Sequence, residues 1–421
     1  MLLAACGSDH EAGTPAADGS PGGSFDGAPA AGGLVITTLV DARPAPVGFV
    51  AVQDGDQAWR RLSSSDGSYR AEIASGRYAA VVACGTDTPA VTLVFLVASL
   101  DERTSWTMNC QVGGAFARAS VEIAGLTGTD RADVSAGSRN EIATAFDPDV
   151  ELYSLWPGTY DIFASSAEQP RRVAASRDVV LSSDVVATVT IDLAEAVEVG
   201  GPEHAITVTG ADVDYSANVS FLSRNGTRFG VGGGAGGTYR PLPNAIVEDG
   251  DMYLGAATWS NFTDPAFRSG GTWTWFREPT DLTLAMPPRF EAIEVGAAST
   301  SPTIRPEMTA SYPGATIYDL LVRQPGAQRA VRVTASAARI ADGAQHRWVM
   351  PDLSEVDGWE DGWGLAPGAG DLEWIATVVA VDGPGGDLAP LDRIAGPPSG
   401  APAGFDGRTE SSAEAKGELA P

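Results

Sequence analysis

Short hydrophobic runs separated by glycine, proline and aspartate recur along most of the chain. Within them apolar and polar residues alternate, as in residues 330–337 (AVRVTASA) and 185–193 (VVATVTIDL). A period of two places the apolar side chains on one face of a β-strand. Similar runs occupy residues 34–39, 47–52, 78–84, 105–110, 205–210, 217–222, 252–259, 272–276, 282–286, 303–309, 316–322, 347–350 and 372–381. The pattern predicts an all-β protein of short strands joined by turns.

Helical periodicity is scarce in this sequence. Sustained apolar spacing of three to four residues with capping signals is missing, and residues 139–146 are the one stretch for which we consider a short helix. The apolar run at residues 90–100 (AVTLVFLVASL) is shorter than the roughly 20 residues of a membrane span. That run therefore predicts a buried strand.

Turn motifs divide the first half of the chain. A DG turn starts the run at residues 66–73 (DGSYRAEI), and GRY at residues 76–78 starts the next strand. GTY at residues 158–160 repeats the second half of this D-G-x-Y…G-x-Y pattern. The pattern resembles the carboxypeptidase-regulatory or transthyretin-like β-sandwich modules of bacterial envelope proteins. This resemblance implies two tandem sandwiches, over residues 34–112 and 113–197.

The second half of the chain continues the strand pattern. The runs within residues 198–297 follow one another at regular spacing, as in an all-β sandwich. Residues 298–395 have a Pro-rich start, a Tyr-bearing strand and an alternating Val strand, an order that resembles a fibronectin type III-like domain. Residues 396–421 are rich in Pro, Gly, Ala and Glu and predict a disordered tail. The expected fold is a series of tandem Ig-like or transthyretin-like β-sandwiches.

Composition and charge exclude one class of partner. The 421 residues include 54 Asp and Glu against 27 Lys and Arg, so the net charge is −27, and the sequence contains no basic block. Nucleic acids attract the opposite charge, and we therefore expect no nucleic-acid partner. The 50 Gly and 28 Pro suit turns between short strands. The 43% hydrophobic residues are enough to bury cores.

The first residues carry a targeting signal. Leu-Ala-Ala-Cys at residues 3–6 resembles the lipobox of bacterial lipoproteins. The resemblance implies cleavage before Cys6, acylation of its thiol and new amine, and, with Gly7 next, an outer-membrane address. The residues before Cys6 are too few for the basic and apolar parts of an export signal, so this interpretation requires a translation start upstream. Residues 7–33 are mainly Gly, Pro, Ala, Ser and Asp, and residues 1–33 thus predict a signal remnant and flexible tether.

Two of the three cysteines remain once lipid occupies Cys6. Cys84 and Cys110 each close a strand-like run. An exported protein folds in an oxidising compartment, so we expect these two cysteines to form a disulfide. The alternative is a pair of free buried thiols. Their spacing excludes a CxxC metal or redox site.

Signatures of catalysis are missing from the sequence. The histidines are His10, His204 and His346, which hardly suffice for a His-based zinc site. Nucleophile-elbow and phosphate-loop motifs do not occur. The acidic loops at residues 248–251 and 352–361 do not match a calcium-binding pattern. We therefore expect no catalytic residues, no metal and no cofactor.

Tryptophans are the remaining candidates for a binding site. Trp273 and Trp275 alternate along a predicted strand, which favours packing in a core. A second pair lies in a Gly-rich acidic loop, whose candidate ligand-binding residues are Trp359, Trp363, Asp357 and Asp361. Indole faces stack on sugar rings, and carboxylates accept hydrogen bonds from sugar hydroxyls. The alternative is that both indoles anchor this loop on the end of a sandwich.

The sequence as a whole predicts a non-enzymatic, lipid-anchored protein of the cell envelope. Its sandwiches would serve structural or protein-interaction roles, and its expected partners are the membrane, through the lipid on Cys6, and an envelope protein or polysaccharide. A glycan-binding envelope module is the alternative function. A hydrolase is a third, less favoured option, because no motif supports it.

Overall fold

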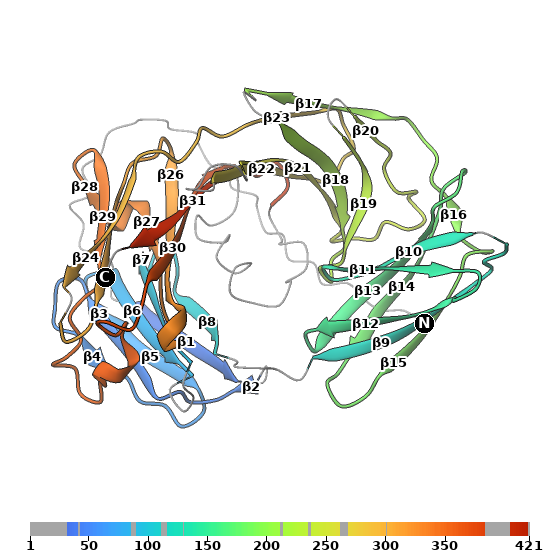
Figure 1. Cartoon of the computed structure of the whole chain (residues 1–421). Helices are drawn as coiled ribbons and strands as arrows, with labels where there is room; N and C mark the ends of the chain where they lie inside the picture. Colours follow the sequence, from blue (N-terminus) through green and yellow to red (C-terminus); the bar gives the residue numbers. More distant parts are fainter. Residues whose placement is uncertain are drawn as a thin grey trace, which may run out of the picture.

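The computed structural model describes residues 32–40, 43–85, 90–110, 116–128, 130–210, 214–234, 237–261, 268–299, 301–383 and 405–419. Within these ranges the chain consists of β-strands, turns and three 3-10 helices of a single turn. The all-β prediction is therefore confirmed. Figure 1 shows strand-rich lobes arranged as an arch, with the first and last strands of the chain in the same lobe. None of the helices in the described ranges has the length and apolar character needed to cross a membrane.

Two facing sheets form the N-terminal lobe. One sheet contains β1 (Gly32–Val40), β2 (Arg43–Pro44), β5 (Ser68–Ile73) and β8 (Ser105–Asn109). The other is built from β3 (Phe49–Asp54), β4 (Arg60–Arg61), β6 (Arg77–Cys84) and β7 (Val91–Ser99). Leu34, Ile36 and Tyr69 of the first sheet pack on Val82 and Leu96 of the second. The strands start at the two predicted turns, where Gly67 and Gly76 adopt φ values of +80° and +71°.

Strands β6 and β7 have both faces buried. Val82 and Leu96 point to the core described above, whereas Val81 and Phe95 point to a second core on the opposite side. A strand between two cores needs apolar residues at every position, which explains the unbroken run at residues 90–100.

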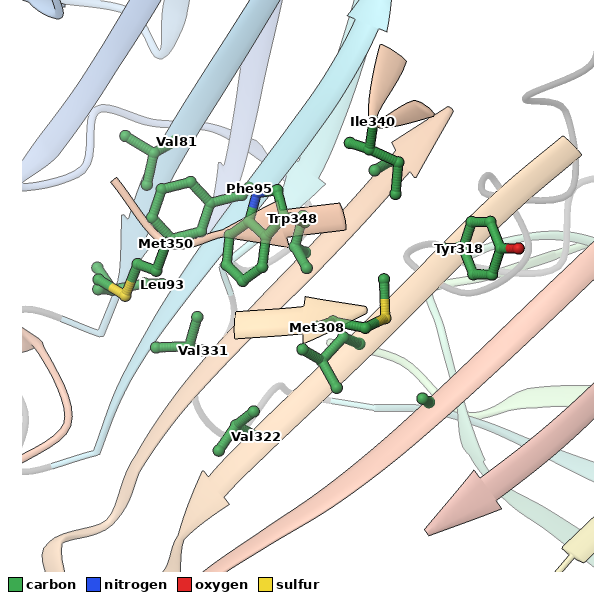
Figure 2. Packing of buried hydrophobic residues seen from close by; sticks show 14 of the residues in the cluster. Val81, Leu93, Phe95, Met308, Tyr318, Val322, Val331, Ile340, Trp348 and Met350 are labelled. Carbon is green, nitrogen blue, oxygen red and sulfur yellow. The ribbon is translucent and has the colours of Figure 1, made fainter. Parts of the chain in front are cut away.

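The second core lies between the N-terminal lobe and residues 293–382. These residues form β24 (Ile293–Ser299), β25 (Arg305–Ala310), β26 (Ala315–Gln324), β27 (Arg329–Ser336), β28 (Ala341–Asp342), β29 (Gln345–Val349) and β30 (Leu372–Asp382), with the 3-10 helices η1 (Pro325–Ala327), η2 (Ala337–Arg339) and η3 (Asp361–Trp363). Trp348 and Met308 of the sheet β24-β25-β29-β28 pack on Phe95 and Val331 (Figure 2). Residues distant in sequence thus share one core.

One continuous sheet of fifteen strands joins three of the four predicted units. Its order is β23-β17-β20-β19-β18-β21-β22-β31-β30-β26-β27-β7-β6-β3-β4. Strand β7 of the first unit pairs in parallel with β27 of the fourth, with Val91 opposite Arg329. The units at residues 34–112, 198–297 and 298–395 are therefore connected edge to edge by backbone hydrogen bonds.

The expectation of a disordered C-terminal tail is wrong for residues 409–419. These residues form β31 (Thr409–Leu419), which pairs antiparallel with β22 on one side and with β30 on the other. Ala413 and Ala415 are buried and alternate with polar residues that are less buried, as expected for a β-strand. Polar composition misled the prediction, because two open sheet edges pair with this segment and bury its small residues. Residues 396–404 lie outside the described ranges.

The second unit is a sandwich of two separate sheets. One sheet contains β10 (Arg131–Ala136), β11 (Arg139–Thr144), β13 (Gly158–Ser166), β14 (Arg172–Leu181) and β16 (Val197–Glu198); the other contains β9 (Ala117–Ala124), β12 (Asp149–Leu155) and β15 (Ala187–Asp192). The helix considered at residues 139–146 is wrong, since this stretch holds β11. Gly137, at φ +57°, turns the chain so that β11 pairs antiparallel with β10.

A curled sheet forms the third unit. It comprises β17 (His204–Thr209), β18 (Tyr215–Leu222), β19 (Arg228–Gly233), β20 (Thr238–Tyr239), β21 (Met252–Asn261), β22 (Arg268–Phe276) and β23 (Leu282–Ala285). Phe221, Phe229 and Tyr253 fill its interior. Phe163 of β13 joins the same core, with its ring centroid 5.5 Å from that of Phe221. The second unit thereby closes the core of the third.

Candidate functional site

The tryptophan loop at residues 357–363 closes a core. Trp363 is only 7% exposed, and its ring centroid lies 5.5 Å from that of Phe49. Trp359 is half-buried, 5.6 Å from the same ring, and its Nε1 donates to Asp361 Oδ1 at 3.0 Å. The indoles meet edge to face, with centroids 5.8 Å apart. The four predicted ligand-binding residues therefore lie in one loop. The core covers Trp363, whereas Asp357 and Asp361 are exposed to solvent.

The cationic side chain of Arg61 packs against the backbone of this loop at Gly358. Gly358 has φ +74°, and a Cβ at this position would clash with Nη1 of Arg61. The Arg61 guanidinium of β4 thus lies directly against the loop backbone, where its Nη2 also donates to the carbonyl of Gly48 at 3.3 Å. The loop is thus fixed by two contacts: its indoles pack on the Phe49 ring, and its backbone at Gly358 packs on Arg61.

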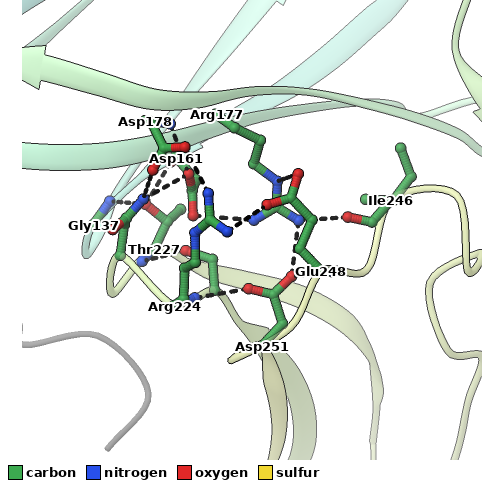
Figure 3. A network of polar contacts seen from close by, with 11 residues as sticks. Gly137, Asp161, Arg177, Asp178, Arg224, Thr227, Ile246, Glu248 and Asp251 are labelled. Atoms are coloured by element: carbon green, nitrogen blue, oxygen red, sulfur yellow. Dashed lines mark hydrogen bonds and ion pairs between the residues drawn. The ribbon is translucent and has the colours of Figure 1, made fainter. Parts of the chain in front are cut away.

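A buried polar network joins the second and third units (Figure 3). Arg177 of β14 donates to Asp161 at 3.0 Å and to Asp251 at 2.9 Å, and both carboxylates have fully buried side chains. Arg224 pairs with Asp178 at 2.6 Å and with Glu248 at 2.9 Å. The Arg177 guanidinium also lies 4.8 Å from the Phe163 ring centroid. The network fixes two units against each other and leaves its carboxylates paired.

The electrostatics of Asp161 follow from these contacts. Burial by itself raises the pKa of a carboxyl group. At Asp161 this effect is outweighed by hydrogen bonds from the Asp178 backbone N–H and the Asn225 amide and by the charge of Arg177, so the pKa is lowered below its ordinary value. A carboxylate with this environment stays ionised and is suited to structural pairing.

Exposed hydrophobic side chains gather on the second unit. Within the described ranges, the large apolar residues with high exposure all lie between residues 116 and 186: Phe116, Ile142, Phe146, Tyr153, Val180, Val185 and Val186. Four of them, with Arg118, Glu151 and Asp184, line a hollow of about 750 Å³. The Phe116 ring packs against Trp156 at 5.3 Å. This apolar face is defined here by Phe116, Tyr153, Val185 and Val186.

A polar cleft of about 560 Å³ lies on the fifteen-stranded sheet, across β21, β22, β31 and β30. It is lined by Ser, Thr and Glu side chains, by Trp259 and Trp273, and by Asp214 and Tyr215 at its border with β18. Of the two alternating tryptophans, Trp275 is buried at 1% exposure and packs on Phe405, as predicted for a core residue. Trp273 is half-buried: it packs against the same core of Met252, Leu254, Trp275 and Phe405, and it also lines this cleft. The cleft is not apparent from the sequence, because its residues come from several strands, of which β22 and β31 are far apart in the chain.

The disulfide prediction is confirmed. Cys84, at the end of β6, is bonded to Cys110, directly after β8. The bond joins the two facing sheets of the N-terminal lobe. Chain-entropy reasoning gives a stabilisation of about 3.5 kcal/mol for closing a loop of this length. Cys6 lies outside the described residues.

Two of the three histidines, His204 and His346, lie in the described ranges and have structural partners, whereas His10 lies outside them. His346 Nδ1 lies 3.1 Å from the Tyr318 hydroxyl, and burial lowers the pKa of the imidazole. His204 Nδ1 lies 3.7 Å from Asp281. The described ranges contain no group of three or more His, Cys, Asp or Glu residues placed to hold a metal ion.

Comparison with known proteins gives little guidance. No family model matches the sequence, and no curated protein matches it. One similar solved structure is the Bacillus anthracis TIE protein, with 11% identity, a TM-score of 0.18 and coverage of 61% of this chain. The match spans 50% of that protein. At this level the likeness supports no inference about fold or function.

Proposed function

We propose that this protein is a non-enzymatic, lipid-anchored component of the bacterial cell envelope that presents its β-rich body to other envelope molecules. The observation that carries the proposal is the Cys84–Cys110 disulfide. Such bonds persist in oxidising compartments and are rare in the cytosol. The disulfide therefore supports export, and the lipobox-like residues 3–6 supply the anchor.

The anchor and the body would be separated by the tether at residues 7–33. Fully extended, a segment of this length spans up to roughly 90 Å. A triacylated Cys6 would bind a bilayer stably, since two or more acyl chains are needed for lasting attachment. The net charge of −27 would keep the body away from anionic lipid.

A protein-interaction role is supported by the apolar face of the second unit. Val185 is 68% and Val186 50% exposed beside the hollow, and Tyr153 is 53% exposed. Contiguous exposed apolar surface is typical of protein-interaction sites. The unit that carries this face lies at the opposite end of the arch from the N-terminal lobe (Figure 1).

Replacing the lipidated cysteine tests the proposal. We expect the wild-type protein, expressed in a bacterial host with its upstream sequence, to fractionate with membranes and to incorporate labelled palmitate. Cys6→Ala should lose both properties. A Cys6→Ala protein that remains equally membrane-bound would contradict the anchor.

A matched cysteine variant serves as control. Cys84→Ser leaves Cys6 intact, so its membrane fractionation should be unchanged. The wild-type protein should change electrophoretic mobility on reduction, whereas Cys84→Ser should not. A wild-type protein recovered fully reduced from the cell would argue against export.

Glycan binding is the second candidate function. The tryptophan loop gives it weak support, because the core covers Trp363. The polar cleft at Trp273 gives it stronger support, because an indole and several hydroxyls face one open space there.

A further inference from the structure

The polar cleft on the fifteen-stranded sheet has the dimensions of a ligand site. Its volume of about 560 Å³ falls within the roughly 300–1,000 Å³ of small-molecule pockets. Its lining combines three aromatic residues, Tyr215, Trp259 and Trp273, with side chains that donate and accept hydrogen bonds. Sites of this composition orient a ligand by a few polar groups while an apolar surface contacts its face.

A row of polar side chains crosses four strands in the cleft. Ser260 of β21 lies opposite Ser269 of β22, which lies opposite Glu414 of β31, which lies opposite Thr377 of β30. Directly opposed residues point to the same face of a sheet, about 5 Å apart. The four side chains therefore form a line across the strands, with donors and acceptors at regular intervals.

A second row runs beside the first. Thr258 lies opposite Gly271, and Gly271 lies opposite Ser412. Within the described part of the chain, Ser260, Ser269 and Ser412 make no side-chain hydrogen bond to other protein groups. On the other face of the same strands, Ser411 donates to Thr272. The cleft side chains thus keep their hydrogen-bonding capacity for a ligand.

Trp273 supplies the apolar surface. A Cβ on Gly271 would lie 2.8 Å from Cη2 of Trp273, so the indole lies down over the glycine two residues before it on the same face. Only a residue without a side chain leaves room for this position. The end of the ring reaches Gly271, and the half-buried indole packs on the Trp275 core while it borders the cleft beside the hydroxyl rows.

We propose that this cleft binds a neutral oligosaccharide segment, with Trp273 stacking on a sugar ring and Ser260, Ser269, Ser412 and Glu414 hydrogen-bonding to its hydroxyl groups. A sugar ring presents an apolar C–H face and a rim of hydroxyls, which matches an indole bordered by hydroxyls and a carboxylate. Apolar ligands would leave these polar groups unpaired, at a cost of about 1–3 kcal/mol each. Anionic ligands would meet Glu414 and Asp214.

Glu414 has an environment that fits this role. Burial raises its pKa, and Lys416 only partly opposes that shift. A half-buried carboxylate without enough hydrogen bonds destabilises the folded protein, and perturbed carboxyl groups in clefts are typical of functional sites. Sugar hydroxyls donating to this carboxylate would compensate for its lost hydration.

The inference rests on the proposed envelope function for its choice of ligand class, since envelopes are rich in polysaccharide. Binding in solution does not depend on Cys6 or on export. The two proposals can therefore fail separately: fractionation tests the anchor, and binding by the purified body tests the cleft.

Affinity electrophoresis provides the test. The purified full chain would be run in native gels containing the neutral polysaccharides β-glucan, mannan, galactan or xylan, with polygalacturonate as the acidic comparison. We expect retardation by at least one neutral polysaccharide. Trp273→Ala should weaken binding about tenfold or more, whereas Trp273→Phe, which keeps an aromatic face, should retain most of it.

Two further variants make the result specific to the cleft. Trp359→Ala, in the tryptophan loop, should bind like the wild type. Glu414→Gln should weaken binding while raising the melting temperature, a combination that a purely structural residue would not give. Loss of binding in Trp359→Ala with retention in Trp273→Ala would overturn the assignment, as would retardation by polygalacturonate alone or by none of these polysaccharides.

Discussion

The surroundings of a single side chain in this protein depend on the residues packed next to it. Trp273 and Trp275 follow the same alternation, yet Trp275 packs on Phe405 in a core and Trp273 borders a cleft. The difference depends on Gly271, which leaves space for the Trp273 indole, and on the strands placed on either side. Alternation along the strand predicted both tryptophans in a core; Trp275 is buried there, and Trp273 packs at the edge of the same core.

Replacement of Arg177 should lower the stability of the folded protein strongly. Arg177→Met would leave Asp161 and Asp251 buried without their cation, and removal of one partner from a buried ion pair costs about 3–5 kcal/mol. We expect a lower denaturant midpoint, measured by tryptophan fluorescence. The matched control is Arg224→Met, whose side chain is 37% exposed and whose loss should lower the midpoint much less, because solvent screens its ion pairs. Equal effects of the two substitutions would contradict the importance assigned to burial.

At the scale of elements, strands far apart in sequence complete each other's sheets. Strand β31 (Thr409–Leu419) inserts between β22 and β30, and β27 accepts β7 in parallel. Each added strand satisfies the backbone N–H and C=O groups of an edge that would otherwise be open. The element therefore matters through its neighbours as well as through its own residues.

Removal of β31 should be severely destabilising. A chain that ends at residue 404 would expose the facing edges of β22 and β30 and uncover the core contacts of Ala413 and Ala415. We expect a lower melting temperature in circular dichroism and association through the open edges in light scattering. A chain that ends at Leu419 keeps the strand and should behave as the full protein. A shortened chain that stays monomeric with an unchanged melting temperature would show that β31 is dispensable.

The whole molecule is acidic, and its stability should depend on pH. Hydrogen bonds from Ser75 and from the backbone N–H groups of Ala74 and Ser75 outweigh burial and lower the pKa of Asp54. At Asp352, the Ser354 hydroxyl and N–H lower the pKa. A depressed carboxyl pKa contributes stability that is present above the unfolded value of about 3.9 and is lost as pH falls through the folded value.

We therefore expect the melting temperature to fall as the pH drops below about 4, measured by circular dichroism between roughly pH 3 and pH 8. Glu414 has a raised pKa and acts in the opposite direction, costing stability at neutral pH and recovering it in acid. Its substitution by Gln should consequently stabilise the protein at neutral pH and have little effect in acid. A melting temperature that rises steadily toward acid would be inconsistent with the lowered pKa values of Asp54, Asp161 and Asp352.

The sequence by itself determined the class of fold and many of its strands. Alternation at residues 330–337 and the turn glycines Gly67 and Gly76 act over a few neighbouring residues, so local rules were sufficient there. The disulfide was also predictable, because only two cysteines remained for it.

Tertiary structure decided how the units are connected and where the clefts lie. The strand at residues 139–144 and the one at residues 409–419 have weak intrinsic preferences, and each forms because an existing edge offers hydrogen bonds. The cleft row Ser260, Ser269, Glu414 and Thr377 exists only once four strands are in register. One of these pairings, Ser269 with Glu414, joins segments more than a hundred residues apart, and the pattern along one segment does not identify its partner.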